Sequence, residues 1–506
     1  MAEGSERDAH SVDEEGQRDD TPGEAIGEAA GGHHDSQPNK PRVIRDSVWG
    51  DIDVTDPVLL AIIDHPLVQR LRRIRSLGLG SDAFPSTHLT RFAHVLGTLH
   101  LCATYYRLRS DDHSWWRLRA DEEGNLVVAP FLAACQALFS DLLTPPFSHS
   151  TEPLLFSTGL LGEQWRRDAR HLLVFMVACD LIERRGEEAV GAIIPKSLET
   201  WSAIWNWCRF VSLHAESAPT DLSAADEGME SLTRLGIDWH SDLLNCWPVW
   251  RIPYDPSLLD SIARNAHYAG LGIAADHRTI SHMWRLRRTV GVEAEEADER
   301  DHENGNVLEI LAKWRSQAGR DVRESVLKLL RLVYLEPGAR RRSAALMCVV
   351  KKDRQLRDAV RRIRRIVSDG YVQTSEGVNG LDQSHTDPRD PLSWRRLVTG
   401  DCTWLATLRD AQSRWLAFDD YFMYARVKVL AMSEEGGLSS AARTALGIDG
   451  DNALPDDIGE LATRYRDYHL NHYRRLLTSQ VRTILGDELC SDVIADDEWL
   501  RIVGDL

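Results

Sequence analysis

The chain has no pair of cysteines at the Cys-x-x-Cys spacing that zinc ribbons use, although it contains eight cysteines. They stand singly, at positions 102, 135, 179, 208, 246, 348, 402 and 490. Disulfide frameworks are typical of short secreted chains, so this scattered pattern also argues against a disulfide-stabilised fold. Unpaired cysteines suit a reducing compartment, and we therefore expect a cytoplasmic protein.

Long apolar runs are also missing from the sequence. The longest run extends from Leu172 to Cys179, far below the ~20 residues that a membrane-spanning helix needs. No apolar stretch of the kind found in secretion signals follows the N-terminus. The sequence therefore predicts that the protein has no membrane partner.

Basic residues are fewer than acidic ones, but most of the acidic excess lies in two short segments. Residues 1–40 carry eleven acidic and three basic side chains, and residues 291–304 carry seven acidic side chains and one arginine. The total net charge is −18, so the rest of the chain is close to neutral. The overall charge is for this reason a poor guide to binding partners.

These two acidic segments suggest how the chain is organised. Residues 1–42 contain almost no large apolar side chains, so we expect a disordered acidic tail there. Residues 291–306 are expected to form an acidic loop or linker. The boundaries predict one domain at 43–290 and a C-terminal helical region at 307–506.

From residue 43 onward, apolar side chains recur at helical spacing, as Leu67, Leu71 and Ile74 do. No sustained strand pattern is present, and only residues 111–128 suit a short hairpin. The sequence predicts an all-α fold, with a helical core and a C-terminal helical extension. Helices are expected at about 91–108, 130–143, 166–185, 256–270, 307–334, 339–367, 403–432 and 455–484.

Three sequence blocks follow one another in an informative order. The first comprises D-S-V-W-G-D-I at 46–52 and Q-R-L-R-R-I-R-S-L-G at 69–78. The second is F-P-S-T-H-L-T-R-F-A-H at 84–94, and the third is F-S-D-L-L-T-P-P-F-S-H at 139–149. In order and spacing they resemble motifs of HD-domain deoxynucleoside triphosphate triphosphohydrolases, the family that includes dGTPase-like and SAM-and-HD-domain proteins. The resemblance implies a helical HD core and a triphosphohydrolase-like site.

The resemblance also implies a metal site with a degenerate ligand set. In the family, adjacent His and Asp residues, an upstream His and a downstream Asp bind a divalent cation. Here His94 and Asp141 stand at two of these positions, whereas Ser140 and Ser257 stand at the other two, and Asp255 is a nearby substitute. Because a hydroxyl is a poor metal ligand, we expect Mn, Fe, Zn or Mg to bind weakly or not at all.

The same resemblance assigns roles to other side chains. Arg91, His149 and Arg264 stand where the family would contact a nucleotide, and cationic donors are suited to phosphate oxygens. Asp141 and His149 are the expected catalytic residues if hydrolysis is retained.

Residues 340–365 form the most basic stretch, with eleven basic and two acidic side chains. Three interpretations remain open: a solvated helix face, pairing with acidic segments of another subunit, and binding of polyphosphate or nucleic acid. The arginines expected to bind a polyanion are Arg340, Arg341, Arg342, Arg361, Arg362, Arg364 and Arg365.

Three functions follow from these patterns. The first is a pseudoenzyme that binds a nucleoside triphosphate or a partner protein through an HD scaffold whose metal site is partly lost. The second is an active, metal-dependent (deoxy)nucleoside triphosphate triphosphohydrolase. The third is a nucleic-acid-binding regulator that uses the basic stretch. A homo-oligomer or a protein partner is expected in each case.

Overall fold

The computed structural model describes most of residues 42–180, and residues 256–271, 316–383, 403–448 and 457–495. Within these ranges the undescribed positions are 83, 85–88, 108–118, 121–125, 128, 157–159, 163–164, 167–168, 171, 175, 178–179 and 435. The chain divides into two compact units, Met1–Lys40 and Pro41–Leu506, and every described element belongs to the second. The acidic loop at 291–306 lies outside the described residues, so the domain boundaries stay predictions. No described helix is long and apolar enough to cross a membrane.

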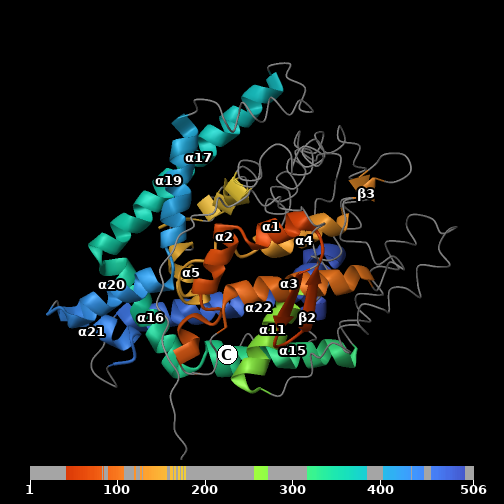
Figure 1. Cartoon of the computed structure of the whole chain (residues 1–506). Coiled ribbons are helices and arrows are strands. Elements are labelled where there is room, and N and C mark those ends of the chain that lie inside the picture. Colours follow the sequence, from red (N-terminus) through yellow and green to blue (C-terminus); the bar gives the residue numbers. More distant parts are fainter. Residues whose placement is uncertain are drawn as a thin grey trace, which may run out of the picture. The chain divides into compact units, whose positions relative to one another are not determined.

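The N-terminal half is organised around helix α3 (Arg91–Arg107), which contacts both α4 (Ala129–Phe139) and α11 (Pro256–Ala269) (Figure 1). Their facing side chains form part of the apolar core and are fully buried, as at Val95 and Ile262. The shorter elements nearby are α1 (Pro57–Ile63), α2 (Pro66–Gln69), η1 (Arg70–Arg73), η2 (Gly78–Asp82), η3 (Ser148–Ser150) and α5 (Glu152–Leu155). The predicted, mainly helical fold is confirmed.

Two small antiparallel hairpins accompany the helices. Strands β1 (Arg42–Asp46) and β2 (Gly50–Val54) pair residue by residue, and Gly50 has a positive φ of 77° at the end of their turn. The sequence interpretation missed this hairpin, because only Ile52 and Val54 of the second strand are buried and the alternation is short. Strands β3 (Arg119–Ala120) and β4 (Leu126–Val127) confirm the hairpin expected at 111–128.

The C-terminal half is a set of packed helices. In chain order they are α15 (Gln317–Leu329), a π-helical turn (Leu330–Tyr334), α16 (Pro337–Lys352), α17 (Arg354–Gln383), α19 (Thr403–Ala417), α20 (Asp420–Met432), α21 (Gly436–Ala445) and α22 (Asp457–Ala495). Helix α16 contacts α21 and α22, and α17 lies beside α19 (Figure 1). Helix α15 contacts α11, so this half packs directly against the core around α3.

Two helices predicted to be continuous are each broken by an aspartate that caps the second half. The helix expected at 339–367 is divided at Asp353, whose carboxylate accepts the backbone N–H of Leu356 and pairs with Arg426. The helix expected at 403–432 is divided at Asp419, whose carboxylate accepts the N–H of Phe422. Aspartate favours such N-cap positions, and in both places the expected single helix was wrong.

Arg70 joins the two halves through a buried guanidinium. It donates hydrogen bonds to the carbonyl of Thr144 at 3.1 Å and to the carbonyl of Phe418, and it lies over the ring of Trp415. Burial lowers the pKa of Arg70 to about 9. A buried cation with such partners fixes the distance between the segments that it connects, and one of them leads into the candidate site.

Candidate functional site

Arg91, at the first position of α3, is the central cation of the candidate site. Its Nη1 lies 3.3 Å from Oδ2 of Asp141, its Nε donates to Oγ of Ser148 at 2.9 Å, and its Nη2 also donates to Nε2 of His149. The side chain is 6% exposed. Burial lowers the pKa of Arg91, but the surrounding acidic and phenolic groups, with the Asp141 carboxylate first among them, together outweigh burial, and the pKa is raised. Arg91 is therefore a fixed positive charge.

Asp141 lies in a turn after α4 and not inside the helix expected at 130–143, because α4 ends at Phe139. Its carboxylate is paired with Arg91, and Nε2 of His94 lies 3.9 Å from the same oxygen. Burial would raise the pKa of Asp141, but these two cationic or ionisable neighbours lower it. The structure thus brings His94 and Asp141 together, as predicted, and adds Arg91 as the counter-charge.

His94 is held by a buried carboxylate that the sequence interpretation did not assign to it. Nδ1 of His94 donates to Oδ2 of Asp260 at 2.7 Å. Asp260 is fully buried and also accepts from Arg264 and from the indole Nε1 of Trp49. Burial would raise the pKa of Asp260, but Arg264 and His94 keep it below the usual value. Because the carboxylate stays ionised, the proton of His94 is fixed on Nδ1.

Gly97 permits this arrangement. It lies on α3 one turn after His94, and a Cβ at this position would overlap Oδ1 of Asp260 and the guanidinium of Arg264. The absence of a side chain therefore lets α11 bring both charged groups against α3.

Ser257 occupies the predicted ligand position beside His94. Its Oγ lies 3.2 Å from Nε2 of His94, the ring nitrogen that does not contact Asp260. Ser140 is directed elsewhere, because its Oγ donates to the carbonyl of Ala137 at 2.9 Å. Asp255, the other candidate ligand, lies outside the described residues.

His149 forms a second histidine–carboxylate pair. Its Nδ1 donates to Oε2 of Glu152 at 2.6 Å, and the hydroxyl of Tyr468 donates to the same oxygen at 2.6 Å. Burial would raise the pKa of Glu152, but His149 beside it lowers the value well below its usual range. Burial and the charge of Arg91 lower the pKa of His149, so its Nε2 is unprotonated and accepts from Arg91. Sequence reasoning missed Glu152, although a glutamate three residues after a histidine is a usable signal.

The turn that presents His149 has unusual backbone angles. Phe147 and Ser148 both have positive φ values, 57° and 48°, which residues other than glycine seldom adopt. The carboxylate of Asp420 accepts the N–H of Phe147 at 2.6 Å, and a Cβ at Gly78 would overlap the carbonyl of Phe147. Backbone conformations of this kind persist where the surroundings impose them and are concentrated at functional sites.

A buried layer of aromatic and imidazole rings lies behind His149. Tyr334 and His469 stack with ring centroids 4.6 Å apart, and the rings of His469 and His149 are 5.7 Å apart. Burial, together with the neighbouring histidines, lowers the pKa of His469 well below its usual value. An uncharged, rigid wall of this kind limits the positions that His149 can adopt.

The residues at the predicted metal position do not fit a tightly bound divalent cation. His94 and Asp141 offer one imidazole nitrogen and one carboxylate, and no group of three His, Cys, Asp or Glu residues in the described part of the chain could hold a metal. Ser257 contributes a neutral hydroxyl, and the guanidinium of Arg91 already neutralises Asp141. A metal site needs more ligands and cannot tolerate a cation so close to one of them.

Arg264 is not placed with the other predicted phosphate ligands. It is buried between Asp260 and Asp46, with N–O distances of 2.9 and 2.8 Å. This placement argues against the predicted phosphate-binding role, because both carboxylates already satisfy the guanidinium. Its function in the site is to hold Asp260 in position.

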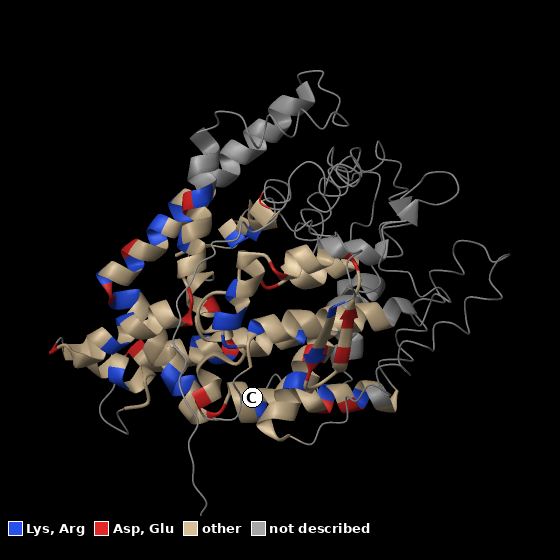
Figure 2. Ribbon diagram, viewed as in Figure 1, with Lys and Arg blue, Asp and Glu red and all other residues tan. Residues whose placement is uncertain are grey.

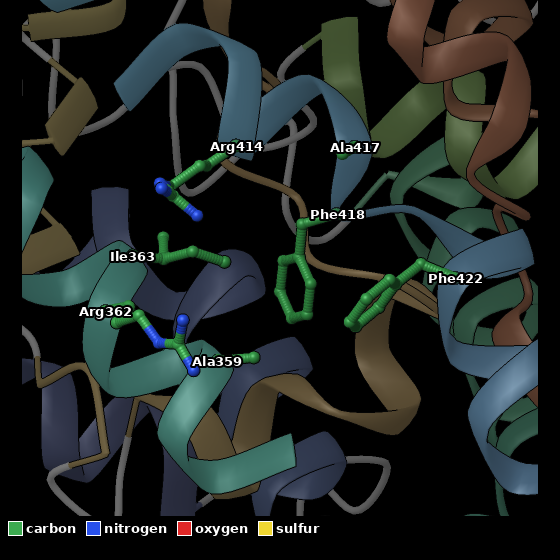
Figure 3. A pocket seen from close by; sticks show the side chains of 7 residues that line it. All are labelled: Ala359, Arg362, Ile363, Arg414, Ala417, Phe418 and Phe422. Atoms are coloured by element: carbon green, nitrogen blue, oxygen red, sulfur yellow. The ribbon is translucent and has the colours of Figure 1, made fainter. Parts of the chain in front are cut away.

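The predicted polyanion-binding arginines lie on two helices and not on one. Arg340, Arg341 and Arg342 are half-buried on α16, whereas four on α17 are exposed, namely Arg361, Arg362, Arg364 and Arg365. Figure 2 shows the basic positions of the helices in blue. Of the α17 arginines, Arg362 lines a groove of about 220 Å³ between α17, α19 and the start of α20 (Figure 3). Its lining combines two arginines with aliphatic and aromatic side chains: Ala359, Arg362, Ile363, Arg414, Ala417, Phe418 and Phe422.

Helix α20 exposes large apolar side chains next to this groove. Tyr421 is 71% exposed, Val429 58% and Met432 79%. Exposed apolar side chains that gather on one helix are typical of interaction surfaces. The predicted homo-oligomer or protein partner stays a prediction.

No family model matches the chain. An uncharacterized protein of Methanocaldococcus jannaschii is 34% identical over 131 residues, which cover 26% of this chain and 24% of that protein. The human deoxynucleoside triphosphate triphosphohydrolase SAMHD1 is 30% identical over 134 residues, which cover 26% of this chain and 20% of the human protein. The chain thus matches these curated relatives over less than a quarter of their length. A phosphohydrolase structure from Bacteroides thetaiotaomicron aligns with 16% identity and a TM-score of 0.42, over 87% of this chain and 86% of that one. The sequence similarity supports a distant relationship to a part of SAMHD1.

Proposed function

We propose that this chain binds a nucleoside triphosphate at Arg91 and His149 without the rapid, metal-dependent hydrolysis of an intact HD site. The observation that carries this proposal is the pair between Arg91 and Asp141, in which a guanidinium neutralises the carboxylate that would otherwise bind a metal. The similarity to SAMHD1, named as a deoxynucleoside triphosphate triphosphohydrolase, supports a nucleotide as the ligand.

The site can offer a phosphate both charge and directed hydrogen bonds. Arg91 is permanently cationic, and His149 lies in hydrogen-bonding contact with it. Asp141 and His149 are 16% and 12% exposed, so this side of the site reaches the protein surface. Charge-assisted hydrogen bonds from a guanidinium to phosphate are among the strongest available to a protein. Without a polarising cation, however, the site lacks the usual means of activating water.

Replacing Arg91 with alanine is expected to weaken binding of dGTP about 10- to 100-fold, since a hydrogen bond to a charged group contributes roughly 1.5–3 kcal/mol. Isothermal titration calorimetry in the presence of EDTA measures this effect. The exposed Arg45 on β1 supplies the matched control, because Arg45→Ala removes the same charge outside the site. Equal affinities for wild type and Arg91→Ala, with both proteins folded by circular dichroism, would refute the proposal.

If the chain is instead an active, metal-dependent triphosphohydrolase, a different result is expected from the same wild-type protein. It requires rapid release of triphosphate from dGTP when Mn²⁺ is added, and no release in EDTA. Chromatographic detection of the products separates the two functions, because the proposed binding protein retains dGTP intact under both conditions.

A second candidate function, binding of single-stranded nucleic acid, is favoured by the groove beside α17. Arg362 and Arg414 border it, and Phe422, which is 39% exposed, supplies an aromatic ring in the same groove (Figure 3). Arginine together with exposed aromatic rings is the usual means of binding unpaired bases and their phosphates.

If this second function is present, Arg361→Glu combined with Arg365→Glu should lower the affinity for a fluorescent single-stranded oligonucleotide at least ~10-fold. The slope of log affinity against log salt should also fall by about 2, because two phosphate contacts are lost. Fluorescence anisotropy at several salt concentrations gives both values. Arg45→Glu with Arg331→Glu is the matched control, since both arginines are solvent-exposed and lie on other elements. An equal loss of affinity in the control pair would mean that only net charge matters.

A further inference from the structure

Three side chains beside the dismantled metal position form a continuous hydrogen-bonded series. Asp260 accepts the Nδ1 proton of His94 at 2.7 Å, and Oγ of Ser257 lies 3.2 Å from Nε2 of the same ring. In the neutral imidazole Nδ1 carries the proton, so Nε2 is an acceptor and the hydroxyl of Ser257 donates to it. A carboxylate, a histidine and a serine linked in this order can remove the proton from the serine hydroxyl.

The series is held rigidly at its carboxylate end. Asp260 is fully buried and accepts hydrogen bonds from Arg264 and from Trp49. His94 is only 3% exposed, and Gly97 leaves the space in which Asp260 lies. The tautomer and orientation of the histidine are thus fixed before any ligand binds, as a general base requires.

Ser257 is also favourably placed for a reaction that develops negative charge. It is the second residue of the 14-residue helix α11, and its side chain is partly exposed. The first turn of a helix presents backbone N–H groups that no carbonyl of the helix accepts, and its dipole favours an anion. Nucleophilic groups gain from this position because charge on the attacked group is stabilised there.

The neighbouring charges indicate which group Ser257 would attack. Oδ2 of Asp141 lies 3.9 Å from Nε2 of His94 and 3.3 Å from Nη1 of Arg91, so Arg91 and the series share one neighbour. The guanidinium neutralises Asp141, so this carboxylate does not repel an anion that approaches Ser257. Such a setting suits the oxygens of a phosphoryl group better than the uncharged carbonyl of an ordinary ester.

We propose that Ser257 is an activated nucleophile that accepts a phosphoryl group from a phosphate monoester, with His94 as the base and Asp260 as the residue that positions it. Oγ of Ser257 forms a bond to phosphorus while the bond from phosphorus to the leaving oxygen breaks. Nε2 of His94 takes the serine proton and returns it to the leaving oxygen. Water then attacks the phosphoserine, which releases phosphate and restores the serine. The substrate class rests on the phosphate binding proposed above, whereas the activation of Ser257 does not.

The decisive test is reaction of the full chain with a fluorophosphonate probe in EDTA, read by intact mass and peptide mapping. The probe phosphonylates an activated serine and releases fluoride, and the expected product carries one label, at Ser257. Ser257→Ala should carry none, and His94→Gln should react about 100-fold more slowly, the lower range of what a general base contributes. Ser316 is the matched control for a serine at a helix start, because its hydroxyl caps α15 by accepting the N–H of Gly319, and it should stay unlabelled. No label at Ser257, or equal rates in wild type and His94→Gln, would overturn the proposal.

A separate measurement tests whether the group that Ser257 attacks is a phosphate ester. Wild type in EDTA should release nitrophenolate from p-nitrophenyl phosphate, and Ser257→Ala should not. Labelling without this release would overturn the assignment to phosphate esters. The test of the nucleophile can be separated from the test of dGTP binding. If Ser257 is labelled in a chain that does not bind dGTP, the nucleophile is supported and the proposed nucleotide ligand is refuted. If the chain binds dGTP but Ser257 is not labelled, only the nucleophile is refuted.

Discussion

Replacing Ser140 with histidine and Ser257 with aspartate is expected to convert a chain that retains little metal after dialysis into one that binds about one equivalent of Mn²⁺. The double variant supplies an imidazole and a carboxylate next to His94 and Asp141. The Oγ of Ser257 already lies 3.2 Å from the ring nitrogen of His94 that faces away from Asp260, so a carboxylate there would be adjacent to a metal ligand. Four protein ligands then replace two, and each addition should strengthen binding by orders of magnitude.

The guanidinium of Arg91 is the main obstacle to rebuilding a metal site with these two substitutions. It lies 3.3 Å from Asp141 and must move away before a cation can share that carboxylate. The two single variants should therefore bind Mn²⁺ substoichiometrically, since three ligands have to compete with the guanidinium. Inductively coupled plasma mass spectrometry after exhaustive dialysis measures the metal content of all four proteins. A full equivalent of metal in the dialysed wild type would revive the active-enzyme interpretation.

The contrast between His149 and Glu152 shows how far the sequence could predict the site. Arg91, His94, Asp141 and His149 were found because each lies inside a contiguous block that resembles a known motif, and the structure brings them together. Glu152 lies outside those blocks. Its carboxylate can be recognised as part of the site only from the hydrogen bonds that it accepts from His149 and from the hydroxyl of Tyr468 on α22.

Contacts between distant segments account for the other differences. Asp260 was assigned no role from the sequence, because nothing in its local sequence shows that Trp49 and His94 converge on it. Arg264 was assigned to phosphate because the sequence does not show that it pairs with Asp46, which lies 218 positions earlier. Residue periodicity identifies the buried face of a helix, but it carries no information about which distant polar group will meet a given side chain.

Removal of the Asp260 carboxylate is expected to lower the free energy of unfolding by about 3–5 kcal/mol, the usual cost of breaking a buried ion pair on one side. Asp260→Ala would leave Arg264, which is 1% exposed, with only Asp46 as a charged partner. It would also leave the Nδ1 proton of His94 and the indole N–H of Trp49 without their acceptor. Urea denaturation followed by circular dichroism measures the loss.

Two further variants identify the cause of this loss. Asp457→Ala breaks a more exposed pair with Lys352, whose side chain is 42% exposed, and should cost less than about 1 kcal/mol. Asp260→Leu combined with Arg264→Met removes both charges together and should recover part of the stability, because the penalty comes mainly from an unpaired buried charge. The recovery should be incomplete, since Asp46 then loses its partner and keeps only the backbone N–H groups of Val48 and Trp49. A double variant as unstable as Asp260→Ala would show instead that the hydrogen bonds to His94 and Trp49, and not the charge of Arg264, make Asp260 necessary for the fold.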